Sequence, residues 1–256
     1  MNLNQLKYYF SIVRAAPFIP LLYYQARHIK NTMLDLPQPE DIVKSEGDDS
    51  FHVLSIGESS IASIGANSQN MGLTGCISSL IKRDKKRNVS YEVVAKSGFT
   101  AANVKDQLLG KIKSTYSDLI LIGLGANDAF QLSSPKKWRK NLDSILDHLG
   151  DKFDKTPIVF IHMPPILEFP IFTPMLKYFV HRQICILKKE LEYIIAPYDH
   201  VHMINDDLTA FGFVEKYKLT NKVVDDFYSD GVHPSELTYK FWAQEIYDFA
   251  AQKHLI

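Results

Sequence analysis

The chain has 256 residues, of which 46% are hydrophobic and 23% are charged, as in an ordinary soluble globular protein. This length suffices for one large domain and a small appendage. The 29 basic and 29 acidic residues cancel, so no overall field favours nucleic acid or a polyanionic substrate. Cys76 and Cys185 lack the spacing of a metal site or a disulfide framework, and the histidines form no His-x-x-x-His pair. We therefore expect no metal and no disulfide scaffold.

Residues 8–24 form an apolar, aromatic stretch that contains Arg14 and two prolines. A membrane-spanning helix needs about 20 uninterrupted apolar residues, so this stretch is too short and too broken to span. No Ala-x-Ala-like cleavage site follows, which argues against a signal peptide and favours a cytoplasmic location. Arg27 and Lys30 come shortly after the stretch. Two alternatives stay open: a hairpin arm packed on the domain, or a monotopic anchor that makes peripheral contact with the inner membrane surface.

Residues 35–50 are polar and contain prolines and a glycine, which is typical of a linker. We therefore predict two parts. The N-terminal arm and linker take residues 1–46, and the main domain takes residues 47–256.

The main domain alternates short apolar runs with longer amphipathic stretches that have helical spacing. The predicted strands are residues 51–56, 90–95, 119–122, 158–161 and 201–204. Alternation of this kind predicts a parallel sheet with helices on both faces. With right-handed crossovers, we expect a three-layer α/β/α fold with a flavodoxin-like five-stranded parallel sheet.

A serine and a histidine with a nearby acid occur where this fold places its chemistry. Ser59 follows the first predicted strand, at the carboxyl edge of the sheet, although helix capping is the favoured explanation for a lone serine there. Asp230 precedes His233 by three residues, so its carboxylate can reach Nδ1 and leave Nε2 to face Ser59. A serine hydroxyl becomes a strong nucleophile only when such an oriented base takes its proton. His162 is the alternative base, but no acid lies beside it in the sequence.

Two further motifs follow the second and third predicted strands. Asn127, within the sequence Gly-Ala-Asn-Asp, can donate its side-chain amide to a developing oxyanion. Gly98 can offer a backbone N–H to the same oxygen. Each motif is also an ordinary loop sequence.

The four motifs together resemble the SGNH or GDSL-type serine hydrolases, over about residues 51–250. The resemblance implies that Ser59 is the nucleophile and that His233 is the base, oriented by Asp230. It also implies an oxyanion hole made of the Ser59 N–H, the Gly98 N–H and the Asn127 amide, with no metal or organic cofactor. The chain departs from the family in two respects. Glu58 stands where the family usually has aspartate, and the N-terminal arm lies outside the minimal family domain.

Residues 166–180 form an apolar segment just past the fourth predicted strand. It can line an acyl pocket or simply cover the core. In the first case the pocket candidates are Ile166, Leu167, Phe169 and Phe172. The sequence thus predicts a serine esterase that favours apolar acyl chains and acts on a small-molecule or lipid-like ester. The alternatives are a carbohydrate or acetyl esterase with the same machinery, and a non-catalytic ligand-binding module.

Overall fold

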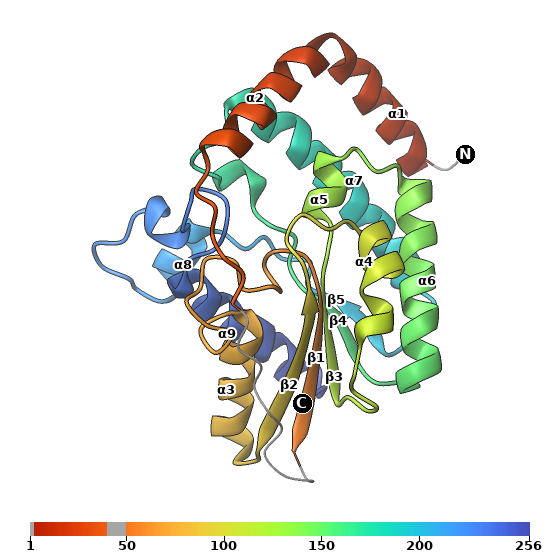
Figure 1. Cartoon of the computed structure of the whole chain (residues 1–256), viewed down its shortest axis with the longest axis vertical. Helices are drawn as coiled ribbons and strands as arrows, with labels where there is room; N and C mark the ends of the chain where they lie inside the picture. Colours follow the sequence, from red (N-terminus) through yellow and green to blue (C-terminus); the bar gives the residue numbers. More distant parts are fainter. Residues whose placement is uncertain (1–2, 40–49) are drawn as a thin grey trace.

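A computed structural model describes residues 3–39 and 50–256 (Figure 1). Its centre is a five-stranded, all-parallel sheet in the order β2-β1-β3-β4-β5, which confirms the flavodoxin-like prediction. The strands are β1 (Phe51–Gly57), β2 (Val89–Ala95), β3 (Leu119–Gly123), β4 (Ile158–Phe160) and β5 (Val201–Met203), each within about one residue of its predicted bounds. The chain leaves β1 toward β2 and returns to β3, so the topological switch point lies between β1 and β3.

Helices cover both faces of the sheet, as predicted. One face carries α4 (Ala101–Gln107), α6 (Pro135–Phe153) and α7 (Pro174–Ile195). The other face carries α3 (Leu73–Lys85), α8 (Ala210–Lys216) and α9 (Glu236–Gln252). Short elements follow strands or join helices: α5 (Ala126–Phe130), η2 (Leu109–Lys111), η3 (Ile166–Glu168) and η4 (Val224–Phe227).

Successive residues of the central strands feed opposite cores, because side chains of a strand alternate between its faces. Leu54 and Ile56 of β1 pack in the cluster under α4, α6 and α7, whereas Val53 packs under α3 and α9. All three are fully buried. Burial on both faces therefore holds the carboxyl ends of the central strands in fixed positions.

The N-terminal arm is a helical hairpin, formed by α1 (Leu3–Ala15), the short η1 (Ala16–Phe18) and α2 (Ile19–Thr32). Pro17 and Pro20 stand in the first turns of η1 and α2, where proline suits a helix start. Both helices contact α7, and Figure 1 shows the hairpin beyond the carboxyl end of the sheet. Among the described residues, no helix has the length and apolar character needed to cross a bilayer. Most of the predicted linker, including the boundary between residues 46 and 47, lies outside the described residues.

Candidate active site

A cavity of about 440 Å³ lies at the carboxyl ends of the strands. Its lining includes one residue from each of the four motifs: Ser59, Gly98, Asn127 and His233. These residues follow β1, β2 and β3 and precede α9. The fold thus brings together parts that are up to 174 residues apart in the sequence.

Asp230 lies behind His233 and is hydrogen bonded to it. Nδ1 of His233 is 2.7 Å from Oδ2 of Asp230, whose side chain is fully buried. Oδ1 accepts hydrogen bonds from the N–H groups of Val232 and His233. Burial alone would raise the pKa of Asp230, but these bonds outweigh it and hold the pKa below its usual value. An ionised carboxylate only accepts, so Nδ1 carries the proton and Nε2 is left as the basic nitrogen.

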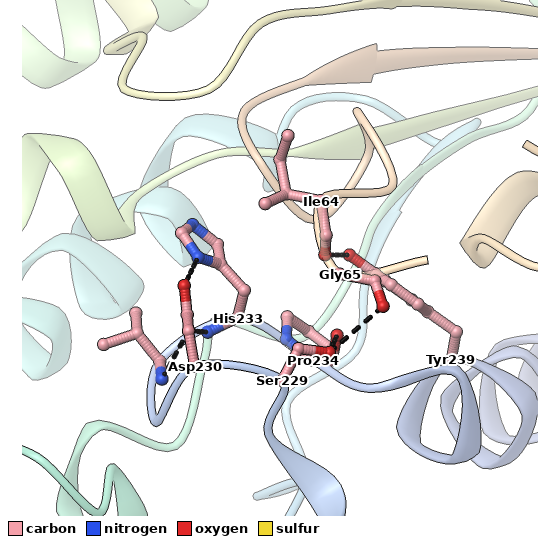
Figure 2. A network of polar contacts seen from close by, with 8 residues as sticks. Ile64, Gly65, Ser229, Asp230, His233, Pro234 and Tyr239 are labelled. Carbon is pink, nitrogen blue, oxygen red and sulfur yellow. Dashed lines mark hydrogen bonds and ion pairs between the residues drawn. The ribbon is translucent and has the colours of Figure 1, made fainter. Parts of the chain in front are cut away.

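Hydrogen bonds connect the loop that holds His233, and the start of α9, to the loop that follows Ser59 (Figure 2). The Tyr239 hydroxyl donates to the carbonyl oxygen of Ile64, and the Ser229 hydroxyl lies 3.0 Å from the carbonyl oxygen of Gly65. Gly65 has φ of +95°, and a Cβ there would lie 2.3 Å from the carbonyl oxygen of Pro234. The close approach of the two loops therefore requires glycine at this position.

Glu58, the departure from the family pattern, positions Asn127. Its buried carboxylate accepts hydrogen bonds from the N–H groups of Ala126 and Asn127 and from Nδ2 of Asn127, the last at 2.6 Å. Burial raises the pKa of Glu58 to about 7, although these bonds oppose the shift. A side-chain amide has two N–H donors, so Asn127 keeps one for another acceptor while Glu58 holds the first.

The next residue, Asp128, ties the same loop to the loop of Gly98. Its buried carboxylate accepts from the N–H of Ala101 at 2.7 Å and from the Ser133 hydroxyl at 2.8 Å. Ala101 begins α4, three residues after Gly98. Gly98 itself has φ of +80°, a backbone conformation that other residues adopt only with strain. Asp128 thus fixes where the Gly98 backbone meets the cavity, a role that the sequence analysis did not assign.

Of the four predicted acyl-pocket residues, Phe169 and Phe172 line the cavity. Ile166 is fully buried in the core, and Leu167 is half exposed. The reason is local, because the tight turn of η3 directs Ile166 to the core and Leu167 to solvent, and Phe169, just after η3, borders the cavity. Further apolar lining, not foreseen from the sequence, comes from Phe130, Leu176, Ile29 and Met33.

His162, the alternative base, also borders the cavity, but its surroundings suit a structural role. Its Nδ1 accepts a hydrogen bond of 3.1 Å from the indole N–H of Trp242. Burial lowers the pKa of His162 to about 3. A general base works best with a pKa near the operating pH, so His162 is a poor candidate for the base.

The chain belongs to the GDSL-like lipase/acylhydrolase family, whose model matches residues 53–246. It is therefore an ester-hydrolysing enzyme of the GDSL/SGNH class. The matched region runs from β1 to α9 and contains all four motifs. A search of curated protein sequences finds no match.

Several solved structures, among them proteins named as esterases, share the fold at low sequence identity. The psychrotrophic esterase EstA from Pseudoalteromonas sp. is 20% identical, with a TM-score of 0.55, and the match covers 80% of this chain and 98% of that one. TesA is 18% identical, with a TM-score of 0.57 and coverage of 80% and 99%. An acetylxylan esterase from Geobacillus stearothermophilus is 15% identical, with a TM-score of 0.53 and coverage of 77% and 93%. About a fifth of this chain has no counterpart in these matches. The N-terminal hairpin also precedes the region that the family model matches.

Proposed function

We propose that this chain is a serine esterase that uses Ser59, His233 and Asp230 to cleave esters with apolar acyl chains. One observation carries the proposal: His233, which is hydrogen bonded to the buried Asp230, borders the same cavity as Ser59, Gly98 and Asn127. A base with an orienting acid, a hydroxyl and convergent donors are the parts that acyl transfer to serine needs.

The reaction proceeds through an acyl-enzyme. The Ser59 hydroxyl oxygen attacks the ester carbonyl carbon while Nε2 of His233 takes the hydroxyl proton. The oxyanion is stabilised by the N–H groups of Ser59 and Gly98 and by Nδ2 of Asn127. The C–O bond to the alcohol then breaks, and His233 gives its proton to the leaving oxygen. Water, deprotonated by His233, attacks the acyl carbon. The bond between that carbon and the Ser59 oxygen then breaks, and His233 returns its proton to the Ser59 oxygen as the acid leaves.

The preference for an apolar acyl chain rests on the cavity lining. Beside the motif residues, the cavity is bordered by aromatic and aliphatic side chains of α5, α7, the η3 segment and α2: Phe130, Leu176, Phe169, Phe172, Ile29 and Met33. A volume of about 440 Å³ exceeds what an acetyl group needs and falls within the range of small-molecule sites. An acetyl-specific carbohydrate esterase remains the rival substrate class, because one structural neighbour is named an acetylxylan esterase.

The test is hydrolysis of p-nitrophenyl acetate, butyrate and octanoate by the wild type, Ser59→Ala and Ser60→Ala. We expect Ser59→Ala to lose activity by a factor on the order of 10⁴ or more, and the neighbouring Ser60→Ala to retain most of it. Near wild-type turnover by Ser59→Ala would overturn the mechanism. We expect activity to persist or rise from acetate to octanoate, whereas a sharp loss beyond acetate would favour the acetyl esterase.

A further inference from the structure

The first helix packs on the domain with its polar side inward. The buried residues of α1 are Asn4, Ser11 and Ala15. Its large apolar side chains point outward and are between 50% and 69% exposed: Leu3, Leu6, Tyr9, Phe10 and Val13. A surface helix of a water-soluble protein normally shows the opposite arrangement.

Specific hydrogen bonds fix this orientation of α1. Nδ2 of Asn4 donates to the carbonyl oxygen of Ile186 at 3.1 Å and to the buried carboxylate of Glu190 at 2.8 Å. Nε2 of Gln183 donates to the Ser11 hydroxyl at 3.1 Å. These three hydrogen bonds are buried, and their polar atoms would need new partners if α1 rotated about its axis. The outward placement of the apolar side chains is therefore built into the packing on α7.

The second helix continues the same surface. Among the described residues of α2 none is fully buried, and its large outward side chains are 43% to 68% exposed: Ile19, Leu21, Tyr23 and Tyr24. Together with the exposed residues of α1 they form what we call the outer face of the hairpin. Exposed apolar side chains gathered on one element mark an interaction surface, unlike single ones scattered over a protein.

The charge of this segment indicates what covers it. Residues 3–34 contain four basic residues, Lys7, Arg14, Arg27 and Lys30, and no acidic one. All four are exposed, and in the described part of the chain none of them forms an ion pair. The rest of the chain holds 25 basic and 29 acidic residues, a net charge of −4, so the hairpin carries a net positive charge of +4 because it lacks acidic residues.

We propose that the outer face of the hairpin docks on an anionic phospholipid surface. Aromatic and aliphatic side chains enter the headgroup region, and flanking cations are attracted to anionic lipids. A second copy of this chain fits less well, because a two-fold dimer through this face would oppose the same four cations. No helix of the described residues is suited to span a bilayer, which agrees with docking in the plane of the surface.

Docking also has a consequence for the active site, which rests on the proposed function. Ile29 of α2 and Met33 just after it line the cavity, while Tyr23 and Tyr24 of the same helix are exposed. A docked hairpin therefore places the cavity one helix diameter, about 10 Å, from the lipid surface. Docking would thus bring the proposed esterase site close to acylated lipids.

The test is flotation of the full chain with vesicles of phosphatidylcholine alone or with phosphatidylcholine and phosphatidylglycerol at a ratio of about three to one. We expect binding to the anionic vesicles that weakens as salt is raised, because the cation term is screened. The triple variant Lys7→Gln, Arg14→Gln, Arg27→Gln should lower partitioning into anionic vesicles by on the order of a hundredfold. The triple variant Phe10→Ser, Val13→Ser, Tyr24→Ser should lower partitioning into both kinds of vesicle by at least about tenfold.

Matched controls carry the same changes elsewhere. Lys136→Gln with Lys140→Gln and Lys218→Gln removes three exposed cations, and Phe211→Ser with Val223→Ser and Tyr193→Ser removes three exposed apolar side chains. These variants should bind vesicles like the wild type. All variants are also assayed on dissolved p-nitrophenyl butyrate, which separates loss of docking from loss of esterase activity.

Three results would overturn the proposal. The first is a wild type that does not float with anionic vesicles at low salt while still hydrolysing the dissolved ester. The second is flotation of the outer-face variants equal to that of the wild type. The third is sedimentation of the wild type as a dimer that the Phe10, Val13 and Tyr24 substitutions convert to a monomer, which would show that a second copy covers the face.

Discussion

The catalytic edge of the sheet and the N-terminal hairpin are both positioned by buried polar contacts. At the edge these contacts orient residues toward a cavity, and on the hairpin they orient apolar side chains away from the domain. At the edge, the carboxylates of Glu58, Asp128 and Asp230 accept backbone N–H groups and hold the reacting residues around a cavity. On the hairpin, Asn4 and Ser11 use polar contacts to turn the apolar side of α1 away from the domain. In both regions buried hydrogen bonds therefore determine the orientation of an element, toward the cavity in one case and toward an external surface in the other.

After Ser59→Ala, the largest effect we expect is at Asp230. Asp230→Asn should lower kcat/KM for p-nitrophenyl butyrate by on the order of 10⁴, because a neutral amide does not offset the charge of the imidazolium and can donate to Nδ1, which moves the proton to Nε2. Asp225→Asn, at an exposed aspartate of η4, is the matched control and should stay near wild type. A loss of less than about tenfold in Asp230→Asn would show that the buried pair is only structural.

The next largest effect is expected at Asn127, the proposed oxyanion donor. Asn127→Ala should lower kcat by about 10² to 10³ with little change in KM, because the lost donor acts mainly in the transition state. Steady-state kinetics on the same ester measure both constants, and Asn205→Ala at an exposed asparagine is the control. A rise in KM with unchanged kcat would instead assign Asn127 to substrate binding.

Protonation of Glu58 at the catalytic edge should make the free energy of unfolding depend on pH. Its pKa is raised from an ordinary 4.5 to about 7, so the folded state binds this proton more tightly than the unfolded state. The free energy of unfolding should therefore fall by about 3 kcal/mol as pH rises from 4.5 through 7, on account of this group alone. Glu58→Gln lacks this titration, so it should gain stability relative to the wild type between pH 5 and pH 8.

Urea unfolding of both proteins at the two pH values measures that difference, and the titration of all other groups cancels in the comparison. An equal pH dependence in wild type and Glu58→Gln would contradict a proton on Glu58 near neutral pH. The carboxylate would then be ionised throughout, held by its three donors.

The smallest effect we expect is on chain-length preference, where the hairpin meets the catalytic edge. Ile29→Ala and Met33→Ala should each lower the ratio of octanoate to butyrate hydrolysis by about tenfold, because distal methylenes lose their contact. Leu21→Ala and Tyr23→Ala alter the outer face of the same helix and should leave the ratio unchanged. An unchanged ratio in the first pair would place the acyl chain elsewhere in the cavity.

The sheet could be predicted from the sequence because its strands are short apolar runs between amphipathic helices, and right-handed crossovers leave few topologies. Ser59, Gly98, Asn127 and His233 could be placed at one edge for the same reason, since each adjoins the end of a strand or the start of the last helix. Their meeting around one cavity agrees with that expectation.

Other features depend on side-chain directions that periodicity does not supply. The segment at residues 166–172 was recognisable as apolar, but the turn of η3 decides that Phe169 and Phe172, rather than Ile166 and Leu167, border the cavity. The inward face of α1 is chosen by partners on α7, 182 and 186 residues away in the sequence for Asn4. Contacts of that range leave no local pattern.

The most direct test of the serine mechanism is labelling with a fluorophosphonate, followed by intact-mass analysis and peptide mapping of the wild type and Ser59→Ala. The account predicts one adduct per wild-type chain, located on Ser59, and no adduct on Ser59→Ala. Equal labelling of Ser59→Ala, or an unlabelled wild type that still hydrolyses p-nitrophenyl butyrate, would contradict it.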